Sequence, residues 1–174
     1  MNMVDEIKKY AASLSDLIAG HQLPASWFAV PDHLAFKGRD SAHYLELVHI
    51  FRPLAKRVSY IHLDNRRLAT AELVKSVVAG DFGAVGWIEI MEPRPEKAGA
   101  DVVGLEHMEF LYPDFEAVKA ELSLKKVAYE LQSNPNHQWI NIVINSAMQE
   151  VKLSNKPLEA IVRQEIEQGE VIIL

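Results

Sequence analysis

The sequence predicts an α+β protein in which one order of elements, a strand, a helix and three strands, occurs twice. Apolar residues switch between helical and alternating spacing in the same order in both halves. The segment 91–101, rich in proline, glycine and charge, separates them. We therefore expect an N-terminal accessory helix (1–22), a first module (30–93), a second module (103–155) and a C-terminal helix and tail (156–174), with the modules forming one globular unit.

The N-terminal segment is expected to form an amphipathic helix over residues 3–19 that docks on the rest of the protein. Gly20 follows it, and glycine is common just after a helix ends. The apolar side chains on one face of this helix are Val4, Ile7, Ala11, Leu14 and Ile18.

The first module should begin with an alternating strand that runs into a turn at Gly38 to Asp40. The helix after this turn has Leu45, Val48 and Leu54 among its apolar positions. The predicted elements are a strand at 32–37, a helix at 41–57, and strands at 58–64, 68–78 and 83–92.

The second module repeats this order, with Pro113 and Asp114 at the start of its helix. The predicted elements are a strand at 104–112, a helix at 113–123, strands at 125–133, 137–145 and 149–155, and a closing helix within 156–169. The two halves share no obvious sequence identity, so the repeat is one of element order.

The composition limits the kinds of partner and of metal site that the protein can have. The 174 residues carry a formal net charge of −6 with no basic stripe, which argues against a nucleic-acid partner. No cysteine is present, so a metal would have to be held by imidazole and carboxylate groups. The N-terminus lacks the apolar block of a signal peptide, and no stretch approaches a membrane span. We expect a cytoplasmic protein, a monomer or homodimer.

Four polar side chains occur in matching strands. His33 and His107 each lie in the first strand of a module, on the face turned away from the large apolar residues. Glu89 and Glu150 lie in the last strand of each module, again turned away from the helix side. The alternation therefore predicts that all four side chains share one open face of the sheet.

This pattern resembles the vicinal oxygen chelate superfamily, in which paired βαβββ modules curl into a cupped mixed sheet around a divalent metal. The strings DHLAFKGRD, GWIEIMEPRP, LEHMEFLYPDFEAV and NIVINSAMQEVKLS are similar to its YecM-like branch. The resemblance implies one metal site with His33, Glu89, His107 and Glu150 as ligands. Two imidazoles with carboxylates suit Fe, Mn, Ni, Co or Zn. For Glu89, the neighbouring Glu92 is an alternative.

The resemblance implies a metalloenzyme acting on a small substrate with two vicinal oxygens, of isomerase or lyase type if Glu89 binds the metal and dioxygenase-like if it does not. Glu89 and Glu150 are then the candidate catalytic groups. His62, Trp139 and Asn141 share the open faces of their strands and are candidate pocket walls. The alternative is a metal-free module of the same fold that binds or sequesters a small molecule.

Overall fold

The computed structural model describes residues 3–63, 65–94, 102–133, 137–169 and 172–173. Its strands form one mixed sheet in the order β6-β7-β8-β5-β1-β4-β3-β2-β9. Each module contributes four consecutive strands, and the modules meet where β1 and β5 pair antiparallel. Within each module the first and last strands are parallel neighbours, β1 with β4 and β5 with β8. The α+β prediction of two βαβββ modules in a cupped sheet is confirmed.

The elements follow the predicted order. Before the first module come α1 (Met3–His21) and the 3-10 turn η1 (Ala25–Phe28). The first module comprises β1 (Pro31–Lys37), α2 (Ser41–Phe51), η2 (Arg52–Leu54), β2 (Ala55–Leu63), β3 (Arg66–Val78), η3 (Gly80–Phe82) and β4 (Ala84–Met91). The second comprises β5 (Gly104–Leu111), α3 (Phe115–Leu124), β6 (Glu130–Ser133), β7 (Gln138–Val143) and β8 (Glu150–Ser154), followed by α4 (Leu158–Glu167) and β9 (Ile172–Ile173).

The predicted helix at 41–57 was too long. α2 ends at Phe51, and a 3-10 turn containing Pro53 leads directly into β2, because proline cannot donate the backbone hydrogen bond that a helix interior requires. Leu45 and Leu54, expected on the apolar face, are exposed. The buried face of α2 consists instead of Tyr44, Leu47, Val48 and Phe51.

The strand predicted at 125–133 was also too long, because β6 covers only its last four residues. Lys126 has a positive φ of 56°, which belongs to a turn rather than a strand. The N–H of Lys126 bonds the carbonyl of Ser123, and that of Val127 bonds the carbonyl of Leu122. These bonds close the end of α3 before the chain reaches the sheet.

Helix α1 supports the second module from outside the cup. Its buried side chains are Ile7, Tyr10, Ala11 and Leu14. The Tyr10 hydroxyl accepts a hydrogen bond from the Met108 N–H, 2.9 Å away, and donates one to the carbonyl oxygen of Glu150. One phenol therefore ties the adjacent strands β5 and β8 together beneath the predicted site.

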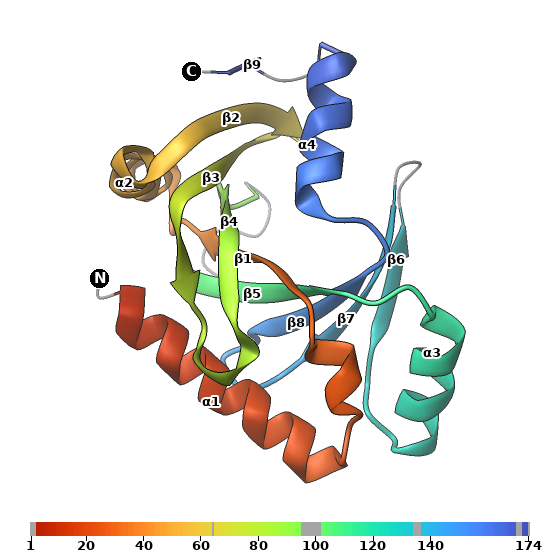
Figure 1. Ribbon diagram of the computed structural model, residues 1–174. Coiled ribbons are helices and arrows are strands. Elements are labelled where there is room, and N and C mark those ends of the chain that lie inside the picture. The colour runs from red at the N-terminus through yellow and green to blue at the C-terminus, as the bar shows by residue number, and fades with distance from the viewer. Residues whose placement is uncertain (1–2, 64, 95–101, 134–136, 170–171, 174) are drawn as a thin grey trace.

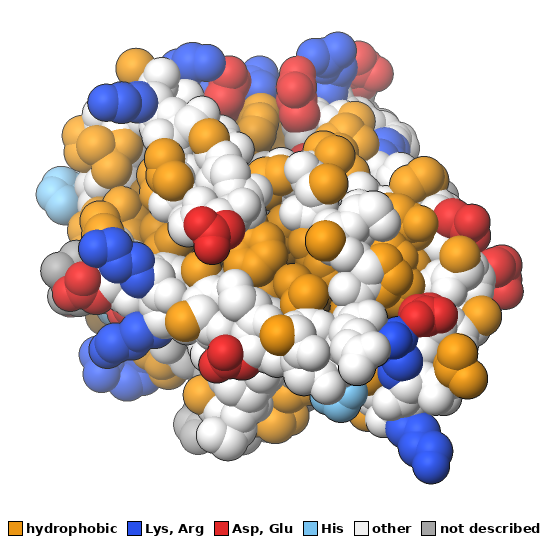
Figure 2. Space-filling model, turned by 60° about the horizontal axis from the view of Figure 1, so that its bottom comes forward, with side chains coloured by type: hydrophobic (Ala, Val, Ile, Leu, Met, Phe, Trp, Pro, Cys, Tyr) orange, Lys and Arg blue, Asp and Glu red, His pale blue; other side chains and the backbone are white. Residues whose placement is uncertain are grey.

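The sheet is curved, and α4 lies over its open side, whereas α1, α2 and α3 lie outside the curve (Figure 1). On the face that carries α1, positive and negative side chains are interspersed around exposed hydrophobic ones (Figure 2). Among the described residues, no helix is both long enough and apolar enough to cross a membrane.

Candidate metal centre

The two predicted histidines lie side by side at the junction of the modules. His33 on β1 pairs with Glu109 on β5, and Ala35 pairs with His107, so these four side chains share one face. The imidazole centroids are 5.6 Å apart, and the rings are inclined by 75°. Both histidines are buried, with 3% and 0% of their surface exposed. The junction therefore places two imidazoles at the floor of the cup.

A β-bulge turns an acidic residue toward each histidine. The pairing of β1 with β5 shifts by one residue at Asp32 and again at Glu106, each directly before its histidine. Asp32 Oδ2 lies 2.8 Å from His33 Nδ1, and Glu106 Oε2 lies 3.4 Å from His107 Nδ1. When a carboxylate accepts a hydrogen bond from the Nδ1–H of a neutral imidazole, Nε2 keeps its lone pair, which is available to a metal. Asp32 Oδ2 also accepts a hydrogen bond of 2.9 Å from the Leu158 N–H at the start of α4.

Three of the four predicted ligands meet in the cup. His33, Glu89 and His107 each offer one donor atom, and these three atoms lie within 4.8 Å of one another. His107 Nε2 is 3.8 Å from Glu89 Oε2. Ala35 pairs with both Glu89 and His107, so its small side chain leaves room for them to approach. On the other side, His33 Nε2 is 4.0 Å from Glu109 Oε2.

The chemistry of this cluster fits a divalent transition metal. Within the described part of the chain, His107 Nε2 and Glu109 Oε1 are buried without a hydrogen-bond partner. Such groups are costly to bury unless something binds them. Two imidazoles and a carboxylate suit several divalent metals, including those of non-haem iron sites. The structure thus contains a buried His/Glu group that could hold a metal ion.

The pKa values of the two histidines are shifted in opposite directions. Burial alone would lower the pKa of His33, but the carboxylates of Glu109 and Asp32 outweigh it and raise the pKa to about 9. Burial lowers the pKa of His107 to about 4, and the nearby ammonium of Lys152 adds to this effect. At neutral pH His107 is therefore neutral, as a metal ligand would have to be, whereas a metal would have to displace a proton from His33.

The pKa values of the carboxylates near the histidines are also shifted in different directions. Burial would raise the pKa of Glu89, but His33 and His107 outweigh it and hold the pKa below its usual value. Burial raises the pKa of Glu109, despite the opposing effect of His33. Burial would also raise the pKa of Glu106, but His107 and the ion-paired Lys37 hold it far below the usual range. Glu89 is therefore suited to binding a cation, and Glu109 to exchanging a proton.

Glu150, the fourth predicted ligand, lies outside both groups of possible ligands among the described residues. The first module indicates where a counterpart of Glu89 would lie. Its carboxylate, Glu89, pairs with Ala35, two residues after His33 in the adjacent strand. Side chains two apart on a strand share a face but are displaced along it by about 6–7 Å.

In the second module the corresponding position holds a lysine. Two residues after His107 is Glu109, and its partner on β8 is Lys152. Glu150 pairs with His107 itself, on the side away from Glu89. The alternation placed Glu150 on the correct side of the sheet, but Lys152 is the positional counterpart of Glu89.

The three residues predicted to line the pocket differ in their position relative to the cavity. Trp139 lines the cavity above the cluster, whereas His62 is exposed and is not among its lining residues. Asn141 is buried on the same face as Trp139, without being part of the lining. The alternative ligand Glu92 lies apart, with its carboxylate bound 2.7 Å from Arg67 Nη2.

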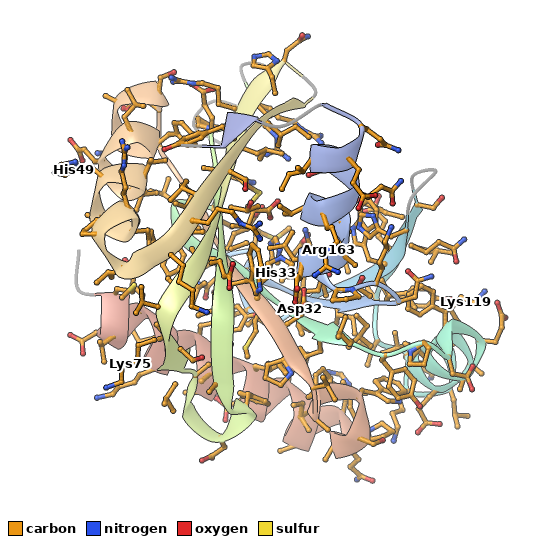
Figure 3. All side chains as sticks on the ribbon, turned by 45° about the horizontal axis from the view of Figure 1, so that its top comes forward. Asp32, His33, His49, Lys75, Lys119 and Arg163 are labelled. Atoms are coloured by element: carbon orange, nitrogen blue, oxygen red, sulfur yellow. The ribbon has the colours of Figure 1, made fainter. Side chains whose placement is uncertain are left out.

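The cavity has a volume of about 530 Å³, and His33, Glu89, His107 and Glu109 all line it. Figure 3 shows His33 and Asp32 near the middle of the molecule, close to α4, whereas His49, Lys75 and Lys119 lie at the periphery. Within the described part of the chain, Arg66 Nε, Trp139 Nε1 and Asn141 Oδ1 are buried without hydrogen-bond partners, and the first two of these residues line the cavity. The volume lies within the range of small-molecule sites.

Alternation places Glu109 on the same face as His107, but sequence reasoning gave Glu109 no role in the site, and it missed Asp32 and Glu106. The available signal was the acid that directly precedes each histidine, in the dipeptides DH and EH. Simple alternation turns such an acid to the opposite face, and only the bulges bring it back.

No protein-family model and no curated protein matches the chain. Among solved structures, the chain is similar to that of the structural genomics protein EC4020, a YecM protein, with a TM-score of 0.76 and 15% identity over 94% of this chain and 91% of that one. It is also similar to hypothetical protein BH1468 from Bacillus halodurans C-125, with a TM-score of 0.51 and 16% identity over 72% and 93% of the two chains. The chain has the vicinal oxygen chelate fold. Within that fold, the likeness to the YecM structure spans nearly the whole chain.

Proposed function

We propose that this protein is a divalent-metal-dependent isomerase or lyase that acts on a small substrate with two vicinal oxygens. The observation that carries the proposal is the convergence of His33, Glu89 and His107 at the floor of a 530 Å³ cavity, with His107 Nε2 unpartnered among the described residues. His33 Nε2, His107 Nε2 and the Glu89 carboxylate would hold the ion. A bound divalent ion would supply a Lewis acid that polarises the substrate oxygens.

In this proposal, Glu109 is the general base. Glu109 is 4% exposed, and its carboxylate lies beside His33 and has a raised pKa, so it can remove a proton from a carbon next to the polarised oxygen and return it to the product. Asp32 and Glu106 hold the imidazoles by Nδ1 and keep Nε2 directed into the cup. Trp139 and Leu158 help to shield the reacting atoms from water.

The test begins with the metal content of purified protein, which should be about one equivalent. A panel of 2-hydroxyketones, hemithioacetals and catechols is then assayed for turnover and for proton exchange with deuterated solvent. Glu109→Gln should keep the metal and lose roughly 10²–10⁴-fold in proton exchange, because an amide cannot accept the proton. A Glu109→Gln variant with unchanged exchange would contradict the assigned base.

A dioxygenase is the second candidate, because two histidines and one carboxylate form the facial arrangement of non-haem iron oxygenases. Oxygen dependence separates the two: an isomerase or lyase turns over anaerobically, whereas ring cleavage of a catechol consumes dioxygen. A protein that binds no metal yet retains a small molecule would favour the metal-free binding module.

A further inference from the structure

Lys152 on β8 occupies the position in the second module that corresponds to Glu89 in the first, so a cation lies where the first module has a carboxylate. Lys152 pairs with Glu109 as Glu89 pairs with Ala35. A carboxylate at this place could reach the same ion as Glu89. An ammonium group has no lone pair to offer and cannot be a ligand.

Lys152 nevertheless belongs to the cup. Its side chain lines the cavity together with both histidines, and it acts electrostatically on Glu89, Glu109 and His107. No hydrogen bond or ion pair within 4.0 Å holds its ammonium group in the described part of the chain. Even the Asn141 Oδ1 acceptor, on the neighbouring residue of β7, is without a partner there. The lysine is therefore available to a molecule that enters the cup.

The charges around the site indicate what that molecule is. A divalent ion bound near Glu89 and Glu109 would be neutralised by their two negative charges, so these two carboxylates would no longer offset the positive charge of Lys152. Arg66, another lining side chain, adds a second cation and has a buried Nε without a partner among the described residues. The loaded cup would attract an anion, and a carboxylate with an oxygen on the adjacent carbon also provides two vicinal oxygens.

We infer that Lys152 is the anion-binding residue of the cup and that the substrate is a small carboxylic acid with an oxygen on its second carbon, the 2-oxo or 2-hydroxy acid class. This inference rests on the proposed metal-dependent function. Lys152 binds one carboxylate oxygen of the substrate. The other carboxylate oxygen and the oxygen on the second carbon would then be the two vicinal oxygens available to a metal ion. Lys152 is a specificity residue, distinct from the metal ligands and from the base.

The test uses oxalate, a small dianion with vicinal oxygens, titrated calorimetrically into Mn(II)-loaded protein. Lys152→Met should weaken oxalate binding at least tenfold while the bound manganese is retained, and Lys152→Arg should recover much of the affinity. Lys75→Met is the matched control, because it removes the same charge from an exposed position on β3 (Figure 3) and should change the affinity less than twofold. Equal oxalate affinity in wild type and Lys152→Met would overturn the inference.

A second measurement tests the position of Lys152 without any substrate. In Lys152→Glu a carboxylate stands where the first module has Glu89, so this variant should bind Mn(II) about tenfold more tightly than Lys152→Met, which removes the positive charge alone. If Lys152→Glu binds the metal no more tightly than Lys152→Met, the positional argument is wrong. A wild-type protein that binds no metal refutes the proposed function itself, and thermal melts of each variant verify that it is folded.

Discussion

Removing His107 should separate metal binding from folding. A ligand present at 1,000 times its Kd stabilises the folded state by about 4.1 kcal/mol. For a chain of 174 residues, each kcal/mol corresponds to about 2–4 °C in Tm. Saturating metal should therefore raise the Tm of the wild type by about 8–16 °C.

In His107→Ala the loss of a metal ligand should cost more than the 10–100-fold typical of residues that only orient a ligand. After a 100-fold loss, the same metal concentration is ten times the Kd and stabilises by about 1.4 kcal/mol, or about 3–6 °C. The metal-free variant should still fold cooperatively, because the apolar side of the sheet is intact; its buried side chains include Leu34, Phe36, Met108 and Phe110.

The assay is differential scanning calorimetry with and without Zn(II) or Mn(II), together with elemental analysis after desalting. His49→Ala is the matched control, since this exposed histidine on α2 lies away from the cup (Figure 3). The quantity to compare is the metal-induced shift of each variant, because the loss of a buried ring changes the metal-free Tm by itself. A full metal-induced shift in His107→Ala would refute the assignment of the site.

Three further predictions concern the surroundings of the site. Because the pKa of His33 is raised to about 9, metal must displace its proton below that pH, and the metal affinity should fall about tenfold for each pH unit between 8.5 and 6.5 in competition titrations. Asp32→Asn and Glu106→Gln should each weaken metal binding by about 10–100-fold, since each carboxylate orients an imidazole. Gly104→Ala should destabilise the protein by about 1–3 kcal/mol in urea unfolding, because Gly104 has a φ of 91° and an added Cβ would lie 2.7 Å from Glu6 Oε2.

Each of these has its contradicting result. A metal affinity independent of pH would mean that His33 is not protonated in the free protein. Unchanged affinity in both Asp32→Asn and Glu106→Gln would leave the bulges without a role in the site. Equal urea midpoints for Gly104→Ala and wild type would show that the start of β5 adapts without strain.

The metal-free protein should also lose stability in acid. The pKa of His107 is lowered from 6.5 to about 4 in the folded state, so protonation favours the unfolded chain as the pH falls below 6.5. The full effect, about 3 kcal/mol, is reached near pH 4. His107→Ala should remove this part of the acid sensitivity, as chemical denaturation at pH 7 and pH 4.5 can measure.

The open face of the sheet was predictable because alternation along a strand is a local property. Leu34 and Phe36 are buried on the helix side, and the polar residues between and beside such pairs turn to the cup. This is enough to place His33, Glu89 and His107 on one face from the sequence. It also places Lys152 and Glu150 on that face, without distinguishing between them.

The choice between Lys152 and Glu150 depends on register. Both lie on β8 with the same orientation, and only the pairing of β5 with β8 determines which of them occupies the counterpart of Glu89. Pairing joins residues far apart in the sequence, so periodicity contains no record of it. If the pairing of β5 with β8 shifted by two residues, every side chain of β8 would stay on its side of the sheet. The counterpart of Glu89 would then carry the carboxylate of Glu150 in place of the ammonium group of Lys152.

The sequence alone determined the α+β class, the two modules and the side of the sheet to which the polar residues turn, because these follow from the spacing of apolar residues and from the turns between them. Only the tertiary structure determined the composition of the site. The bulges at Asp32 and Glu106, the pairing of Glu109 with His33, and the hydrogen bond that Asp32 accepts from the Leu158 N–H at the start of α4 all arise where separate strands and a helix meet. Each depends on a one- or two-residue shift between segments distant in the chain, which the hydrophobic pattern of either segment leaves open.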